Sequence, residues 1–124
     1  MNHALSTKIY ADSYALSVSI FQRTKAIPKA QRPTLARGLE ECSLELLFAV
    51  RAAGVAGLVE HKRLACHKAS DALDRVRIYA QVSKDLGFFS DTAYFELSEK
   101  SAEVGRQLGG WLKSLGHAKP PPNE

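Results

Sequence analysis

The chain contains few cysteine, methionine and tryptophan residues. Of its 124 residues, two are cysteine, one is methionine and one is tryptophan. Two cysteines cannot supply the dense disulfide framework of a small secreted domain. Cys42 and Cys66 both fall in helical patterns near apolar faces, so we expect buried free thiols, with a disulfide between them as the alternative.

Motifs for metal binding and for catalysis are also missing. The four histidines, His3, His61, His67 and His117, do not have the spacing of metal ligands, and Cys66 points away from its neighbours His61 and His67. The sequence contains no nucleophile paired with a base, no glycine-rich phosphate loop and no paired Glu-x-x-His motif of di-iron bundles. We therefore expect no enzymatic activity, no bound metal and no cofactor.

Long apolar runs are absent as well. No segment approaches the ~20 consecutive apolar residues of a transmembrane helix, and residues 1–8 lack the apolar stretch of a signal peptide. These absences predict a cytoplasmic protein with no membrane partner. The hydrophobic content of 45% and charged content of 24% are those of one ordinary globular domain.

What the sequence does contain is apolar residues at helical spacing. Four helices are expected, at about residues 12–27, 34–53, 60–86 and 91–115. They form one domain of residues 1–116, and residues 117–124 are expected to be a disordered tail. Residues 16–20 alternate like a strand, but no partner strand with a hairpin turn is present, so a helix is favoured there. The short connections predict an all-α, antiparallel up-down-up-down four-helix bundle.

Capping residues mark the ends of the expected helices. Asp12 or Ser13 is a good N-cap for the first helix. Gly87 is expected to end the third helix, because glycine adopts a left-handed conformation at little cost. Ser90 followed by Asp91 is expected to cap the last helix, where an acidic side chain is also favourable at the positive end of the helix dipole.

The expected last helix carries two glycines that require an explanation. Gly105 and Gly109 stand in one line with Ser98 and Ala102, beside the apolar core line of this helix. A glycine in a helix interior costs about 1 kcal/mol relative to alanine. We therefore expect the backbone of another helix to pass close to both glycines. Arg106, on the outer face, is expected to pair with its neighbour Glu103.

The helices carry more apolar surface than one bundle can cover. The first helix has two apolar lines, one of Tyr14, Val18 and Phe21 and the other of Leu16, Ile20 and Ile27. Six apolar residues lie off the core lines of the second and third helices: Leu44, Leu47, Phe48, Leu64, Ile78 and Val82. Scattered exposed leucines are normal and offer an alternative, but clusters on two successive helices favour self-association. We predict a homo-oligomer with these six residues at its interface.

The charge of the chain is mildly basic and is concentrated partly on the third helix. The net charge is +4 and the pI is about 9.2, which favours an anionic partner. Residues seven apart on one side of this helix, here named the basic strip, are Arg63, Ser70, Arg77 and Lys84. In a monomer, a solvated face with local ion pairs is the simpler interpretation. A ring of subunits would repeat the strip and sum its charge, as binding of a phosphate backbone requires. The predicted nucleic-acid contacts are Arg63, Arg77, Lys84, Lys68 and Arg75.

The most distinctive run of the chain is Glu-Val-Gly-Arg-Gln-Leu-Gly-Gly-Trp-Leu-Lys at residues 103–113. Weaker signals are Tyr-Ala-Leu from Tyr14, Ile-Pro-Lys from Ile27, the helix at residues 35–47, and Leu-Gly-Phe-Phe-Ser at residues 86–90. Over about residues 8–115 the chain resembles one family of four-helix bundles. This family includes the accessory variability determinant (Avd) of diversity-generating retroelements and the proteins encoded in ribosomal RNA intervening sequences.

The resemblance implies a pentameric barrel of four-helix bundles with a basic surface. It also implies, for the Avd branch, binding of the retroelement's reverse transcriptase and of RNA or DNA in support of mutagenic cDNA synthesis. Arg77 matches a position that is usually basic in the family, whereas Gln81 stands where a second arginine is often found; Lys84 follows one turn later. The alternatives are a stand-alone protein of the intervening-sequence branch and a purely structural oligomer.

Overall fold

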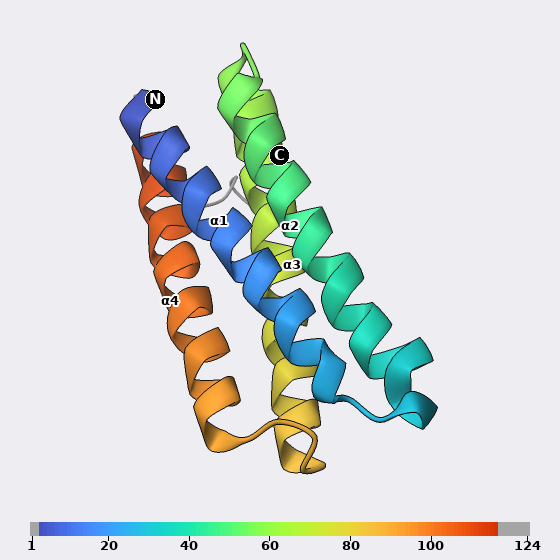
Figure 1. Ribbon diagram of the computed structural model, residues 1–124. Coiled ribbons are helices and arrows are strands. Elements are labelled where there is room, and N and C mark those ends of the chain that lie inside the picture. Colours follow the sequence, from blue (N-terminus) through green and yellow to red (C-terminus); the bar gives the residue numbers. More distant parts are fainter. Residues whose placement is uncertain (1–2, 117–124) are drawn as a thin grey trace, which may run out of the picture.

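The described part of the chain is a bundle of four long helices. The structure is a computed structural model; it describes residues 3–116, with side chains from residue 7 onward. The helices are α1 (His3–Arg23), α2 (Arg37–Val55), α3 (Val59–Asp85) and α4 (Asp91–Ser114), and no strand occurs among the described residues. Figure 1 shows that successive helices run in opposite directions, so the predicted all-α up-down-up-down bundle is confirmed. The predicted tail, residues 117–124, lies outside the described residues.

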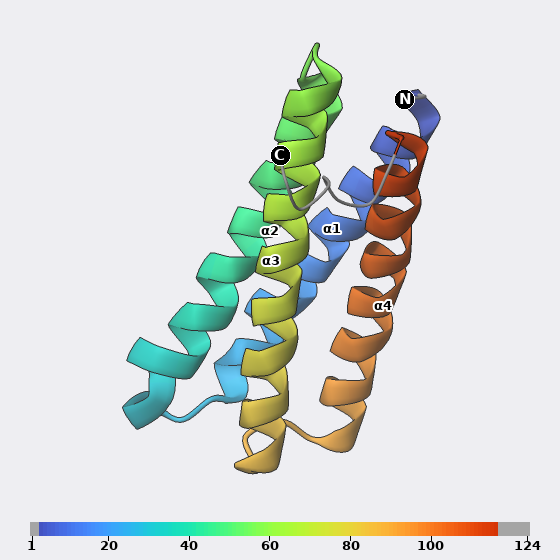
Figure 2. The same cartoon turned by 180° about the vertical axis from the view of Figure 1, so that it is seen from behind.

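Each helix packs against the helices that precede and follow it, and α1 also packs against α4. Figure 2 shows the same arrangement from behind, with α3 between α2 and α4. The core consists of one apolar side from every helix, including the fully buried Leu16, Leu46, Val76 and Trp111. Amphipathic helices that each bury one side against two neighbours produce this arrangement.

The first helix differs from the prediction at both ends. It begins at His3 rather than near residue 12, because residues 3–11 contain no proline or glycine to interrupt it. Asp12 is therefore not an N-cap, and Ser13 is fully buried inside the helix. At the other end α1 stops at Arg23, and the Thr24 hydroxyl donates hydrogen bonds to the Phe21 carbonyl and to Glu40.

Of the two apolar lines of α1, only one belongs to the core. Leu16, Ile20 and Ile27 are buried, with exposed fractions between 0% and 3%. The other line, Tyr14, Val18 and Phe21, is exposed. A helix at the corner of a bundle buries one stripe against its two neighbours, so a second stripe on the same helix must face outward.

The connection between α1 and α2 is a series of short turns. One-turn 3₁₀ helices cover Thr24–Ala26 and Lys29–Gln31, and the π-helical turn Arg32–Ala36 then leads directly into α2. The Arg32 side chain ties this connection together, because its Nη1 donates to the Thr24 carbonyl at 3.0 Å. The predicted start of the second helix near residue 34 therefore falls inside the π-helical turn.

The predicted signals between α3 and α4 are confirmed. Gly87 has a φ of +83° and follows the C-cap of α3. The hydroxyl of Ser90 accepts a hydrogen bond from the amide of Ala93 at 3.1 Å, and Asp91 begins α4. A glycine that reverses the chain and a serine that caps the next helix together define this corner.

Both cysteines are free and buried, as expected, so the alternative of a disulfide between them is wrong. Burial raises the pKa of the Cys66 thiol to about 11. It also raises the pKa of the Cys42 thiol. Both groups are therefore uncharged in the folded protein near neutral pH and pack as small apolar side chains.

Close approach at the α4 glycines is only partly as expected. A Cβ on Gly105 would lie 2.9 Å from Nη2 of Arg77 and 3.3 Å from Cδ2 of Leu73, so side chains of α3 rather than its backbone occupy the space. At Gly109 nothing lies within 4 Å of that position, and the prediction is wrong there. A closer contact than that at Gly105 occurs at Gly38 of α2, where a Cβ would overlap the ring of Tyr79.

Gly38, which is in close contact, and Gly109, which faces open space, make a matched test of this packing. We expect Gly38→Ala to lower the free energy of unfolding by about 1–3 kcal/mol, because the Tyr79 ring must move out of its site. Gly109→Ala is expected to raise it by up to about 1 kcal/mol, because alanine has the better helix propensity and meets open space. Urea unfolding followed by circular dichroism measures both; equal effects of the two substitutions would contradict this packing.

Candidate nucleic-acid and self-association surfaces

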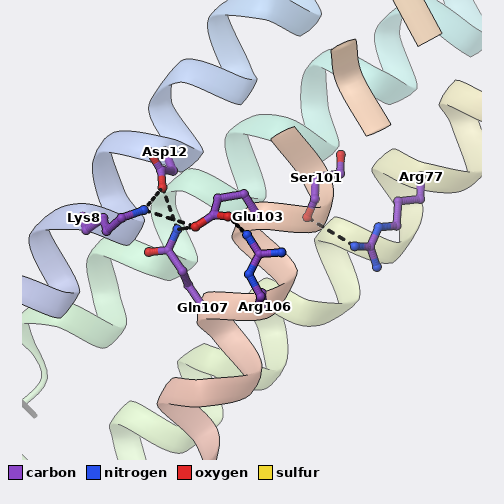
Figure 3. A network of polar contacts seen from close by, with 7 residues as sticks. All are labelled: Lys8, Asp12, Arg77, Ser101, Glu103, Arg106 and Gln107. Atoms are coloured by element: carbon purple, nitrogen blue, oxygen red, sulfur yellow. Dashed lines mark hydrogen bonds and ion pairs between the residues drawn. The ribbon is translucent and has the colours of Figure 1, made fainter. Parts of the chain in front are cut away.

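Two arginines of the basic strip hold α3 against α4. Nη2 of Arg63 donates a hydrogen bond to the Leu115 carbonyl at 3.1 Å, and Nη2 of Arg77 donates to the Ser101 carbonyl at 3.2 Å; Figure 3 shows the second of these bonds. Arg63 and Arg77 stand as far apart in the sequence as Ser101 and Leu115 do. The two bonds therefore belong to a single antiparallel register of α3 and α4.

Lys84 continues the same register toward the other end of the bundle. Its Nζ lies 5.3 Å from the centre of the Tyr94 ring, a cation–π geometry. The strip consequently packs along α4 instead of pointing freely into solvent. The side chain of Arg63 is 21% exposed and that of Arg77 is 47% exposed. Of these two arginines, Arg77 presents the larger surface to a ligand.

The exposed part of Arg77 borders a small pocket between α3 and α4. Side chains that can donate hydrogen bonds dominate its polar lining: Arg77, Gln81, Tyr94, Ser98 and Ser101. No carboxylate lines the pocket among the described residues, although Asp74 lies 4.0 Å from Nη1 of Arg77. A pocket of donors beside a guanidinium suits an anion such as a phosphate group.

The other two predicted contacts, Lys68 and Arg75, lie on a different face. Both line a groove between α2 and α3 whose apolar wall includes Leu44 and Phe48. Nη1 of Arg75 is 3.8 Å from Glu45, an exposed ion pair. The structure thus divides the five predicted nucleic-acid residues between two surfaces, three on the α3–α4 side and two in the α2–α3 groove. One protomer does not bring them together into one site.

The six predicted self-association residues all lie outside the closed core. Leu44, Phe48, Leu64, Ile78 and Val82 are exposed, and Leu47 is partly buried. Phe48, at 67% exposure, is the largest of the exposed side chains on α2. Leu44 lines the α2–α3 groove and also a second groove between α1 and α2. Self-association itself stays a prediction.

The exposed line of α1 extends this apolar surface and was not assigned to an interface from the sequence. Tyr14, Val18 and Phe21 line the α1–α2 groove together with Leu44 and Leu47. One turn earlier Tyr10 is also exposed, and its ring centre lies 6.3 Å from that of Tyr14. The two apolar lines of the sequence were the available signal, because only one of them can face the core.

A polar network joins α1 to α4 on the opposite side of α4 from Arg77. Figure 3 shows Lys8 between two carboxylates, with Nζ 2.8 Å from Asp12 and 3.2 Å from Glu103. The amide of Gln107 donates to Asp12 at 2.6 Å. Arg106 forms its expected ion pair with Glu103. The hydrogen bond from Lys8 lowers the pKa of the Asp12 carboxyl below its usual range.

A second polar contact between α1 and α4 lies nearer the other end of the bundle. Nε of Arg23 donates to Glu96 at 2.7 Å, and the Ser19 hydroxyl donates to the same carboxylate at 3.3 Å. The hydrogen bond from Arg23 lowers the pKa of the Glu96 carboxyl. Each α1–α4 network therefore contains an ionised carboxylate, Asp12 in one and Glu96 in the other. Protonation of that carboxylate at low pH weakens the network.

Residues 3–116 contain neither a cluster of metal-binding side chains nor a helix suited to a membrane. No group of three or more histidine, cysteine or acidic side chains is arranged to hold a metal ion within this range. None of the helices within it combines the length and the apolar character needed to cross a bilayer.

Comparison with known proteins assigns no family to the chain. No protein-family model matches it, and no curated protein matches it either. The resemblance described above therefore rests on the residues that carry it, chiefly residues 103–113.

The Glu96 contact makes the stability of the bundle depend on pH in a defined direction. Because the folded-state pKa of Glu96 lies below its ordinary value of 4.5, its contribution is complete above that pH and is lost as the pH falls through the folded-state pKa. We expect Glu96→Gln to flatten the fall in unfolding free energy between about pH 5 and pH 3. Glu99→Gln is the control, because Glu99 is exposed and makes no ion pair among the described residues. Equal flattening by both variants would contradict the attribution of this pH dependence to the Glu96 contact.

Proposed function

We propose that this chain is a non-catalytic accessory protein of a diversity-generating retroelement. In this role it forms a homo-oligomer, a pentamer by family resemblance, and binds nucleic acid and the retroelement's reverse transcriptase to support mutagenic cDNA synthesis. The observation that carries the proposal is a four-helix bundle that combines exposed apolar grooves along its sides with a row of cations on α3.

Self-association is supported by the extent of the uncovered apolar surface. It runs from Tyr14 and Phe21 on α1 across Leu44 to Phe48 on α2, and further apolar side chains lie exposed on α3. Monomeric proteins rarely leave contiguous apolar patches of more than a few hundred Å². A second copy that covers one of these grooves would remove this surface from water.

Nucleic-acid binding is supported by charge rather than by a base-reading motif. Part of the Arg77 side chain is accessible beside the donor-lined pocket. Lys84 follows seven residues later on the same side of α3. Lys68 and Arg75 contribute from the α2–α3 groove. A single protomer with a net charge of +4 has a modest field, but an oligomer repeats every cation around its axis, and phosphate binding depends on such summed charge.

Two alternatives use the same fold. A stand-alone member of the intervening-sequence branch would have no polymerase partner, and the genes beside this one distinguish it: a reverse-transcriptase gene with a template repeat supports the retroelement role. A purely structural oligomer would use its basic groups only for solubility, and it would give no gel shift with RNA or DNA at low salt.

The oligomer is tested by size-exclusion chromatography with light scattering at micromolar concentration. We expect the full chain to elute at a multiple of the 13.6 kDa protomer mass. Phe48→Asp is expected to shift the population toward smaller species, because it places a charge in an apolar contact. Phe95→Asp, at an equally exposed phenylalanine of α4 outside both apolar grooves, serves as the control. A wild-type mass of 13.6 kDa would exclude the oligomer.

Nucleic-acid binding is tested by fluorescence anisotropy with a labelled RNA over a series of salt concentrations. Arg77→Ala with Lys84→Ala is expected to weaken binding and to reduce the salt dependence by about one unit of slope per lost phosphate contact. Lys68→Ala with Arg75→Ala is the parallel pair for the α2–α3 groove. Melting temperatures are recorded alongside, since Arg77 also binds the Ser101 carbonyl. Unchanged affinity in both pairs would rule out α3 as the binding surface.

A further inference from the structure

The end of the bundle formed by the α2–α3 connection is apolar, and no other described residue covers it. Residues 52–59, here named the apolar tip, read Ala-Ala-Gly-Val-Ala-Gly-Leu-Val and contain no polar side chain. Three large side chains are exposed there: Val55 at 68%, Leu58 at 60% and Val59 at 51%. Surface connections are normally polar, because apolar side chains gain nothing from solvent, so a fully apolar one calls for a covering partner.

The register of α3 and α4 explains why none of the described residues, 3–116, covers the apolar tip. Arg63 of α3 already meets Leu115, which follows the last residue of α4, so the residues before Arg63 have no α4 beside them. Figures 1 and 2 show the α2–α3 connection extending past the neighbouring ends of α1 and α4. The tip is therefore a protruding element of the bundle, unlike the apolar grooves that run along its sides.

The polar groups around the apolar tip are mainly hydrogen-bond donors or cations. Leu58 is the N-cap of α3, with φ −104° and ψ 141°, and no side chain accepts a hydrogen bond from the first turn. Arg51 and His61 are exposed and make no ion pair or side-chain hydrogen bond among the described residues. Lys62 donates to the Ala53 carbonyl at 3.1 Å. Glu60 is the one acid in this segment, and it lies 3.9 Å from Arg63.

We infer that the apolar tip docks into a partner protein through an apolar pocket rimmed by carboxylates. The inference rests on the proposed function, in which this partner is the retroelement's reverse transcriptase. The pocket covers Val55, Leu58 and Val59, while the carboxylates accept hydrogen bonds from the open first turn of α3 and pair with Arg51. Apolar contact and charge complementarity then act on one small, convex element.

Two other occupants fit the tip less well. The hydrocarbon of a bilayer offers no acceptor to the uncapped amides of α3, and such groups are costly there. A second copy is better placed along the sides, where the grooves offer larger apolar surfaces. Three exposed side chains form a small interface with any single protein, because a stable interface takes about 20–30 residues on each side. In an oligomer the tip is present once per protomer, so a partner that contacts several copies gains from multivalency.

Leu58 offers a substitution that separates docking from folding. Asp at this position supplies the missing N-cap of α3 and removes an exposed apolar side chain, so the melting temperature should not fall. Leu58→Ser does the same without adding charge. Phe95→Asp on α4, 62% exposed, is the matched control away from the tip.

The experiment measures the affinity of the full-length chain and its variants for the reverse transcriptase encoded by the same retroelement. We expect Leu58→Asp and Leu58→Ser to weaken binding at least about tenfold, with oligomer mass and RNA affinity unchanged, and Phe95→Asp to bind as the wild type does. Wild-type affinity in both Leu58 variants would overturn the inference and leave the proposed function standing. A wild-type chain that binds no reverse transcriptase would overturn the proposed function itself.

Two further measurements test whether a second copy of the chain or a lipid surface covers the tip instead. If Leu58→Asp lowers the oligomer mass in light scattering, the tip is a contact between copies and the inference is overturned. If wild-type chain co-sediments with vesicles of phosphatidylglycerol and phosphatidylcholine, and Leu58→Ser does not, the tip binds a lipid surface and the inference is overturned in the same way.

Discussion

The antiparallel register of α3 and α4 determines which parts of the surface of the bundle are accessible to a partner. Two guanidinium-to-carbonyl hydrogen bonds, from Arg63 to Leu115 and from Arg77 to Ser101, fix this register. It places Gly105 against Arg77, and so gives α4 a reason for one of its glycines. It also leaves the first turn of α3 beyond the end of α4. Hydrogen bonds with charged donors are worth about 1.5–3 kcal/mol each, enough to favour one register over slipped alternatives.

Different pairs of helices are held by different chemistry. The contact between α2 and α3 is made by small and apolar groups, with Gly38 against the Tyr79 ring and a line of buried alanines on α3. The contact between α1 and α4 relies on carboxylates that bind Lys8 and Arg23. In α1 and α2, the buried hydroxyls of Ser17 and Ser43 bond to each other at 3.0 Å. Apart from the exposed Arg75–Glu45 pair, the α2–α3 contact therefore depends little on pH and salt, whereas the α1–α4 contact responds to both.

Most of the fold could be predicted from the sequence, because local signals and the apolar period agree over α2, α3 and α4. Gly87 and Ser90 are sufficient to define their corner. The start of α1 could not be predicted, since Asp12 has the chemistry of a cap but is used in a contact with α4. Gly38 could not be identified either, because its partner, Tyr79, is distant in the sequence.

The candidate site was predictable residue by residue but not as a surface. Spacing on α3 correctly groups Arg63, Arg77 and Lys84, and it separates them from Lys68 and Arg75. It does not reveal that the first three lie against carbonyls and a ring of α4, because this depends on the register between two helices. Nor does it show that Tyr14 and Phe21 face outward, which follows from the position of α1 at a corner of the bundle.

Leu44 is shared between the two side grooves, since it forms part of the wall of each. The Leu44 side chain occupies one of a few rotamers, so a change of rotamer alters the lining of both grooves. A partner that binds in the α1–α2 groove and turns Leu44 would therefore also change the shape of the α2–α3 groove. In the proposed homo-oligomer, this single side chain would link the binding of a copy in one groove to the shape of the other groove.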